Sequence, residues 1–491
     1  MKMSEARKKN LLLPKQQSGS WDQVDAVDYI EFPDADYERA PKESYQAFRD
    51  IKFAVRIHWG PYSMWQMDRE SWRYLKLSHE QKQQYQQLYQ SFCAEGFDAE
   101  HWMQLFEDSG IQCFAFTAKH HDGFSMYHTK TKVKKRANWT APGGPVIEDC
   151  DVHYSVEETP YGKDIVRELC DSARRHGIKI DLYFSHPDWY DADFRPFMYH
   201  PMLTPDADEL VFPEELERFE LEHGAQRDLF PPADEAARKR MMARHRAQLL
   251  ELVQNYGPID MMCLDMWLGH SVWPEMRETI KQLRRASPKT MLRARGIKDY
   301  GDYYTPEGFV PGNKANTNMP WMCIYPLASS FSYDDCAGNY KGAGWMVQNL
   351  VDCVSKGGSF MVGIGPDGSG RFHPEAERQL LEVGQWLRKN GEAVYSTKPR
   401  ESELYQDGPT VRFTQTEDGK TLYAFLLHEP GCKKILSNIE GNRLLRVSLL
   451  ENGRELPFTC DASGFVTVDC SMLHWEGTPV TLKLEFAQAV K

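Results

Sequence analysis

Short apolar runs alternate with amphipathic stretches along residues 50–400. An apolar run of about four to eight residues bounded by turn signals is typical of a strand buried on both faces, and apolar residues three and four apart indicate a helix. The pattern predicts strands at 51–57, 111–118, 178–184, 259–264 and 290–294. It predicts helices at 164–176 and 235–256, and helical spacing also runs through 80–108.

Strands that alternate with helices form right-handed βαβ units and a parallel sheet. Polar residues follow successive predicted strands at His58, His120, His121, Asp265 and Arg295. In a parallel barrel these carboxyl ends meet on one face, where active sites are built. We therefore expect a (β/α)8-like, TIM-type barrel. A doubly wound open sheet is the alternative, but it often has a Gly-rich turn after its first strand, and none follows here.

The pattern changes near residue 396. Short segments at 410–414, 421–425, 445–449, 464–468 and 480–484 are strand-like, several alternate, and turn signals such as Asp418-Gly419 separate some of them. The sequence predicts a flexible tail at 1–20, a catalytic barrel at 21–395 and an antiparallel β-sandwich at 396–491. Residues 197–232 are expected to be an irregular insertion, and the segment up to Pro320 a long functional loop.

Composition narrows the class of protein. The 491 residues are 41% hydrophobic and 12% aromatic, which indicates a globular chain. A net charge of −12 argues against nucleic-acid or anionic-membrane partners. The odd number of cysteines, 11, forms no tight framework, and three leucines before Pro14 are too few for a signal-peptide core, so we expect a cytoplasmic protein. Abundant tryptophan and tyrosine are often used to stack on sugars.

The residues alone point to one carboxylate and a pair of histidines. Asp265 closes a buried run, where a charge must be paired or partly hydrated; capping the next helix is the alternative role. Imidazoles such as His120 and His121 can donate or accept hydrogen bonds. Neighbouring side chains on a strand point to opposite faces, so we expect no metal site, and no cofactor.

Several collinear motifs resemble the glycoside hydrolase family 29 α-L-fucosidases. They are residues 58–63 (His-Trp-Gly-Pro-Tyr-Ser), 119–124 (Lys-His-His-Asp-Gly-Phe), the strand ending in Asp265, Arg295 through Glu307, 354–358, 365–368 and 386–393. The resemblance implies a barrel followed by a β-sandwich, a retaining mechanism without a metal, and a fucosylated or L-galactosylated oligo- or polysaccharide as partner. The linkage, the aglycone and the oligomeric state are left open.

The resemblance also assigns roles. Asp265 matches the nucleophile, and Glu307, twelve positions after Arg295, matches the general acid/base of many members, although an exposed loop glutamate is the alternative reading. A retaining glycosidase needs such a pair of carboxyl groups. The residues expected to bind substrate are Arg56, His58, Glu70, Trp72, His120, His121, Tyr183, Arg295, Trp321 and Phe331.

Two departures concern the pocket for the C6 methyl group of the sugar. Many relatives have aromatic residues where this chain has Arg56 and Cys263, whereas Phe331 keeps its aromatic ring. The main prediction is an exo-acting α-L-fucosidase, and α-L-galactosidase is the runner-up. Two other classes remain to be weighed: a carbohydrate-binding protein without catalysis and a metal-dependent barrel hydrolase.

Overall fold

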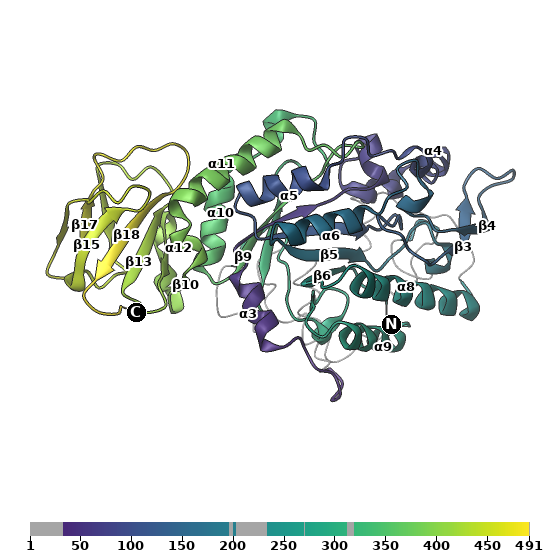
Figure 1. Ribbon diagram of the computed structural model, residues 1–491, viewed down its shortest axis with the longest axis horizontal. Coiled ribbons are helices and arrows are strands. Elements are labelled where there is room, and N and C mark those ends of the chain that lie inside the picture. Colours follow the sequence, from purple (N-terminus) through teal and green to yellow (C-terminus); the bar gives the residue numbers. More distant parts are fainter. Residues whose placement is uncertain (1–32, 196–199, 203–232, 270, 312–318, 491) are drawn as a thin grey trace.

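The computed structural model describes residues 33–195, 200–202, 233–269, 271–311 and 319–490. Figure 1 shows a larger part, in which helices surround a parallel sheet, and a smaller part of antiparallel strands that carries the C-terminus. The tail predicted at 1–20 and most of the insertion predicted at 197–232 lie outside the described residues.

Seven parallel strands form the main sheet, in the order β7-β6-β5-β2-β1-β9-β8. Their bounds are β1 (Phe53–Ile57), β2 (Cys113–Lys119), β5 (Lys179–Ser185), β6 (Met261–Asp265), β7 (Met291–Leu292), β8 (Met322–Pro326) and β9 (Ser359–Ile364). Isolated parallel bridges connect Arg293 with Tyr303, Tyr304 with Trp321, and Glu307 with Ile324, so residues 303–307 lie between the two edge strands. The predicted α/β alternation is confirmed, in a sheet curled into a half-barrel. Closure into eight strands stays a prediction.

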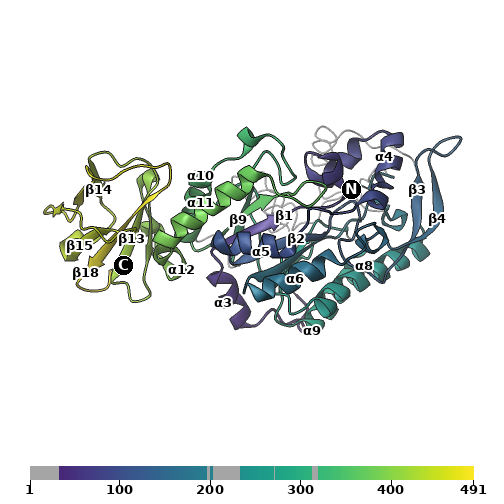
Figure 2. The same cartoon turned by 45° about the horizontal axis from the view of Figure 1, so that its top comes forward.

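Helices cover the outside of this sheet (Figures 1 and 2). Their bounds are α3 (Lys42–Asp50), α4 (His79–Tyr85), α5 (Ala99–Asp108), α6 (Ile165–Arg175), α8 (Glu235–Asn255), α9 (Trp273–Ala286), α10 (Ala343–Ser355), α11 (Pro374–Asn390) and α12 (Glu392–Tyr395). Asp98, Asp164 and Asp234 precede α5, α6 and α8, and each side chain accepts a hydrogen bond from a first-turn amide. Within the described segments, no helix combines the length and apolar character needed to cross a bilayer.

The inward and outward positions of the strands have different compositions. Outward residues such as Val55 and Phe114 join the large cluster beneath the helices. The inward cluster consists mainly of small and sulfur-containing side chains, and includes Ala54, Cys113, Ala115, Met261, Met291, Met322, Ile324 and Met361. Arg56, Cys263 and Arg293, each two positions after a member of that cluster, are buried too. The interior therefore changes from apolar to polar toward the carboxyl ends of the strands.

The C-terminal part contains two antiparallel sheets. One sheet contains β10 (Lys398–Pro399), β11 (Gln406–Asp407), β12 (Val411–Gln415), β13 (Thr421–Leu426), β15 (Leu444–Leu449) and β18 (Val480–Phe486), and the other contains β14 (Lys433–Leu436), β16 (Phe458–Cys460) and β17 (Val466–Asp469). The predicted antiparallel strands are confirmed. Both sheets contribute to one hydrophobic cluster, for example through Phe413 and Val466, as a sandwich requires.

Contacts with α10, α11 and α12 attach the C-terminal part to the larger part. Arg412 forms an ion pair of 2.6 Å with Asp352, and the Trp386 indole donates to the Pro479 carbonyl at 2.8 Å. Thr414 donates to the Ala393 carbonyl at 2.8 Å. Polar contacts therefore cross the domain boundary predicted at 395/396. The position of that boundary stays a prediction.

Several elements differ from the sequence prediction. β7 spans two residues instead of the five predicted at 290–294, because Arg293 pairs with Tyr303 through an isolated bridge. Strands β8 and β9 were not predicted. Pro326 ends β8 and Gly357-Gly358 precedes β9, and these turn-forming residues obscured the two short apolar runs. The hairpin of β3 (Val133–Asn138) and β4 (Val146–Val152), which projects at one end of the molecule in Figure 1, was also missed.

Asp302 should contribute strongly to stability, because its buried carboxylate connects four segments. It accepts hydrogen bonds from Ala40 N, the Tyr45 hydroxyl and Leu292 N, and it pairs with Arg284 at 2.5 Å. We expect Asp302→Ala to lower the free energy of unfolding by about 3 kcal/mol or more, since it leaves a buried guanidinium and amides unpaired. Urea unfolding measures this change.

The matched control is Glu382→Ala, which removes a half-exposed partner of Arg378. Exposed ion pairs contribute about 0–1 kcal/mol, so its unfolding midpoint should stay close to that of the wild type. Equal losses in the two variants would contradict the role assigned to Asp302.

Candidate active site

Asp265, the last residue of β6, is buried and is the centre of the candidate site. Arg295 Nη1 lies 2.8 Å and Arg293 Nη1 3.5 Å from its Oδ1. His121 Nε2 lies 3.3 Å from Oδ2, and the Tyr183 hydroxyl donates to the same oxygen. The carboxylate is therefore surrounded by donors from several elements.

These neighbours determine the protonation state of Asp265. Burial alone would raise its pKa, but the positive charges of Arg295 and Arg293 and the Tyr183 hydrogen bond hold the pKa well below its usual value. Burial and the nearby carboxylate raise the pKa of Tyr183, so its hydroxyl stays a donor. An ionised, desolvated carboxylate with fixed donors is the form in which a carboxylate acts as a nucleophile.

Glu307 is the second carboxyl group at the site. Its Oε2 lies 3.7 Å from Arg295 Nη1, the nitrogen that also contacts Asp265. The Glu307 side chain is 40% exposed, against 4% for Asp265, so Glu307 is the more accessible of the two carboxyl groups to solvent. The two oxygens nearest Arg295 are separated by no more than about 6.5 Å, the sum of their distances to the shared nitrogen. That limit favours the close spacing of retaining glycosidases, about 5–5.5 Å.

His120 and His121 both face the site, which differs from the expectation that neighbours point to opposite faces. They follow the end of β2, where the pairing with β5 is irregular between Thr117 and Lys119. Such irregularities redirect side chains next to active sites. The two rings lie 4.4 Å apart; the His120 ring stacks with the Tyr183 ring, and His121 reaches Asp265.

Burial keeps the site histidines neutral. It lowers the pKa of His120 to about 3 and that of His58 and His121 well below the usual value. His120 Nδ1 lies 2.5 Å from the Ser71 hydroxyl, and the His58 ring stacks on Phe331 at 5.0 Å. Neutral imidazoles can bind hydroxyl groups as donors or acceptors.

Glu70 and Trp72 belong to the 3-10 helix η2 (Glu70–Lys76). The Glu70 amide donates to the Ser332 hydroxyl at 2.7 Å, and this hydroxyl donates to Glu70 Oε1 at 3.2 Å. Trp72 packs against His121 at 4.7 Å and Trp189 at 5.2 Å. Burial, followed by the charge of Glu307, raises the pKa of Glu70 to about 8. Glu70 is therefore protonated at neutral pH and able to donate a hydrogen bond.

Arg56 lies in the buried polar layer below the site. Its Nη2 donates to Cys263 Sγ at 3.0 Å, Arg293 Nη1 donates to the same sulfur at 3.3 Å, and the guanidinium lies 5.6 Å from the Tyr183 ring. Asp181 is the acidic neighbour whose charge favours the ionised form of Arg56.

Trp321 does not join the other predicted residues. It immediately precedes β8, at the amino end of the sheet, and its ring packs closely over Gly358. A β-carbon at Gly358 would lie 2.3 Å from that ring, so the glycine makes room for the indole. Asp265 lies at the carboxyl end of β6, whereas Trp321 lies at the amino end of β8. The position of Trp321 therefore does not support its assignment to substrate binding.

Arg293 and Ser332 are residues of the site that the sequence analysis missed. Arg293 could have been predicted from the sequence, because it lies two positions before Arg295 and side chains two apart on an extended segment face the same side. Ser332 had none, since it is 262 positions from Glu70.

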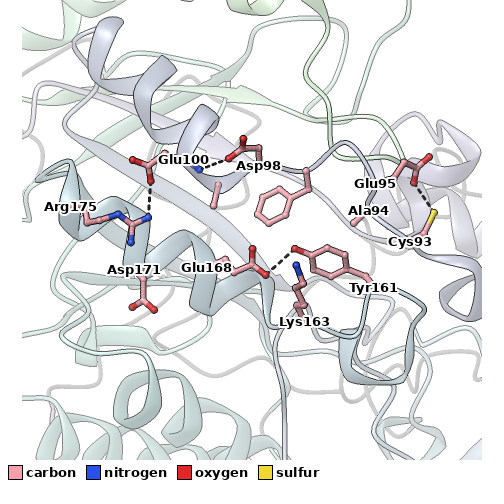
Figure 3. A pocket seen from close by; sticks show the side chains of 12 residues that line it. Cys93, Ala94, Glu95, Asp98, Glu100, Tyr161, Lys163, Glu168, Asp171 and Arg175 are labelled. Carbon is pink, nitrogen blue, oxygen red and sulfur yellow. Dashed lines mark hydrogen bonds and ion pairs between the residues drawn. The ribbon is translucent and has the colours of Figure 1, made fainter.

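A separate hollow of about 600 Å³ lies away from these residues, between α5, α6 and neighbouring loops (Figure 3). Two of its carboxylates are engaged, Glu168 with the Tyr161 hydroxyl at 2.9 Å and Glu100 with Arg175 at 2.7 Å. It contains none of the predicted site residues. The cluster around Asp265 is therefore the better candidate for catalysis.

Comparison with known proteins identifies the family of the chain and supports its fold. The sequence profile of the α-L-fucosidases matches residues 30–392. Plasma α-L-fucosidase of Pongo abelii is 26% identical over 411 residues, covering 78% of this chain and 76% of the relative. Tissue α-L-fucosidase of Rattus norvegicus is 24% identical over 470 residues, covering 90% and 88%.

Solved structures show the same fold. α-L-Fucosidase isoenzyme 1 from Paenibacillus thiaminolyticus superposes with a TM-score of 0.71 at 24% identity, covering 91% of this chain and 99% of the other. The family 29 α-L-fucosidase of Bacteroides thetaiotaomicron has a TM-score of 0.70 at 19% identity, covering 94% and 99%. The match to the family profile shows that the chain is a glycoside hydrolase. Because the profile covers most of its length, the chain belongs to the α-L-fucosidase family, glycoside hydrolase family 29.

Catalysis should not depend on a metal ion. In the described ranges, no three or more His, Cys, Asp or Glu side chains are grouped to hold one. His120 Nδ1 contacts Ser71, and His121 Nε2 contacts Asp265. We expect dialysis against EDTA to leave kcat/KM for an aryl glycoside unchanged. Loss of activity that zinc restores would contradict the assignment of these histidines to sugar hydroxyl groups.

Proposed function

We propose that the protein is a retaining exo-glycosidase that hydrolyses terminal α-L-fucosides through a covalent glycosyl-enzyme on Asp265. The observation that supports this most directly is the single nitrogen of Arg295 that lies 2.8 Å from Asp265 and 3.7 Å from Glu307. It brings an ionised carboxylate and an accessible one close enough for double displacement. In the same proposal, residues 303–307 complete an eight-stranded barrel and the C-terminal strands form a β-sandwich.

In the first step Asp265 attacks the anomeric carbon while the bond to the aglycone oxygen breaks and Glu307 gives that oxygen its proton. In the second step water attacks the same carbon, the bond to Asp265 breaks and Glu307 takes the proton from water. The low pKa of Asp265 provides the anion for attack. The Tyr183 hydroxyl and Arg295 hold the carboxylate in place.

Sugar recognition is assigned to the neutral and aromatic groups around Asp265. His58, His120 and His121 offer uncharged ring nitrogens, and protonated Glu70 offers a donor. Trp72 packs beside His121. Such a set suits the hydroxyl groups of a terminal sugar in a fucosylated oligo- or polysaccharide. A binding protein without catalysis would have no need for two carboxyl groups that share an arginine.

Asp265→Gly tests the nucleophile. The variant should lose about 10³-fold or more of its activity on an activated aryl α-L-fucoside, and sodium azide should restore turnover with the β-L-fucosyl azide as product. Azide occupies the space of the lost carboxylate, so it attacks from the same face. Formation of the α-azide would show that another group attacks. Asp335→Gly, which removes an exposed carboxylate four positions after Phe331 in the sequence, is the control and should behave like the wild type.

Glu307→Ala tests the acid/base. It should hydrolyse a substrate with a poor leaving group far more slowly than an activated one, because only the former needs a proton in the first step. With azide it should give the α-L-fucosyl azide, since attack then occurs on the glycosyl-enzyme. Unchanged activity on the poor substrate would move the acid role to another residue.

A second candidate substrate is an α-L-galactoside, which carries a hydroxyl group where L-fucose has a methyl group. The observation that favours it is the buried guanidinium of Arg56 beside Cys263, where the resemblance places the pocket for C6. A methyl group on an aromatic wall gains about 1 kcal/mol from burial. A pocket that hydrogen-bonds a hydroxyl can reject the deoxy sugar much more strongly.

The ratio of kcat/KM for matched aryl α-L-galactoside and α-L-fucoside tests this second candidate. We expect Arg56→Phe to shift the ratio toward the fucoside by about tenfold, whereas Arg73→Ala, which removes a half-exposed arginine, should leave it unchanged. A wild type that prefers the fucoside by about 10³ or more, together with an unmoved ratio in Arg56→Phe, would exclude the galactoside.

A further inference from the structure

Arg295 is placed between the two carboxyl groups of the proposed mechanism. Its Nη1 lies 2.8 Å from Asp265 Oδ1 and 3.7 Å from Glu307 Oε2. Both contacts are ion pairs, and a small side-chain movement would shorten the longer one. In the unreacted enzyme Asp265 is therefore the nearer of these two carboxyl groups to the guanidinium.

Arg293 approaches Asp265 differently, from the interior. Its Nη1 lies 3.5 Å from Asp265 Oδ1 and 3.3 Å from Cys263 Sγ, and Arg56 donates to the same sulfur. Arg293 is almost completely buried, and Asp181 lies in the field of both interior arginines. These contacts anchor Arg293 below the nucleophile. Arg295 contacts the second carboxyl group as well.

The charges change during the proposed reaction. Attack of Asp265 converts its carboxylate into an ester, and in the same step Glu307 gives its proton to the leaving oxygen. The negative charge opposite Arg295 therefore moves from Asp265 to Glu307. A buried guanidinium requires a counter-charge, so the favourable partner of Arg295 also changes. Hydrolysis of the ester restores both original states.

We propose that Arg295 is a positioning residue that transfers its ion pair from Asp265 to Glu307 when the glycosyl-enzyme forms, and that this transfer favours the anion of Glu307 that takes the proton from water. This inference rests on the proposed function and assigns one arginine to both half-reactions. In the first step Arg295 keeps Asp265 ionised. In the second step it keeps Glu307 ionised.

Other ionisable groups face this pair of carboxyl groups. Toward Asp265 they are Tyr183 from β5, His120 and His121 after β2, His186 after β5, His58 after β1, and Arg293. Burial keeps these histidines neutral, so their charge does not change near neutral pH. Toward Glu307 they include Glu70, which is protonated below about pH 8. Arg295 forms an ion pair with each of the two carboxyl groups.

The first experiment measures pH profiles with an activated aryl α-L-fucoside, for which a burst of aryl alcohol shows that hydrolysis of the glycosyl-enzyme limits kcat. Loss of a cation makes a carboxylate protonate at higher pH, so the acid limb of each profile moves upward. Arg295→Met should move the acid limbs of both kcat/KM and kcat by about one pH unit. Arg293→Met should move only that of kcat/KM, because Asp265 is uncharged in the intermediate.

The inference is wrong if the acid limb of kcat stays in place in Arg295→Met. It is also wrong if that limb moves by the same amount in Arg293→Met as in Arg295→Met. Arg295→Lys keeps the positive charge and should restore the limbs toward their wild-type positions, which a merely structural role would not require.

The second experiment uses the wild-type enzyme, so it does not depend on the folding of a variant. A crystal structure of the glycosyl-enzyme trapped with a 2-fluoro-fucosyl fluoride should show Arg295 within about 3.2 Å of Glu307. If the sugar is attached to Asp265 but Arg295 stays with the ester, the inference is wrong and the proposed function stands. If the sugar is attached to another residue, the proposed function itself is wrong.

Discussion

The charge of Asp265 is the constraint on which the site depends. A carboxylate that is 4% exposed at the end of a buried strand would be protonated without compensation, and the structure compensates it with Arg293, Arg295 and the Tyr183 hydroxyl. These groups come from β5 and from the segment after β7, so the parallel sheet must be in register before the anion is stable. Removal of Arg293 or Arg295 should therefore affect both the stability of the fold and the ionisation of Asp265.

The interior below this anion explains how three arginines are tolerated there. Small and sulfur-containing side chains fill much of the inside of the sheet, and the polar residues Arg56, Asp181, Cys263 and Arg293 are buried next to them; Asp181, for example, pairs in register with Met261. Burial raises the pKa of the Cys263 thiol to about 11, against the charges of the two arginines, so the sulfur stays a neutral acceptor. The Cys263 thiol thus accepts hydrogen bonds from both guanidiniums, the charge of Asp181 lies near them, and Arg293 also reaches Asp265.

The sequence was sufficient to predict site residues that directly follow a buried strand. The runs that became β1, β2, β5 and β6 were visible as apolar segments, and the residues at their ends, from His58 to Asp265, meet as a parallel sheet requires. It was insufficient where a residue acquires its role from a distant segment. The hydroxyl of Ser332 has a partner 262 positions away, and Trp321 has an aromatic side chain but lies at the wrong end of its strand. Strands β8 and β9 were missed because proline and glycine at their ends conceal short apolar runs.

The two hydrogen bonds between Glu70 and Ser332 affect the order in which the pocket around Asp265 forms during folding. Ser332 follows Phe331, the ring that stacks on His58, so one wall of the pocket is held by residues from opposite ends of the larger part. Contacts of such long sequence separation form after local ones, because the loop between them must first be closed. During synthesis, a ribosome-bound chain that already contains Asp265, His120 and His121 still lacks this wall. This wall is thus a feature that the chain gains late, after Asp265 and the two histidines have been synthesised.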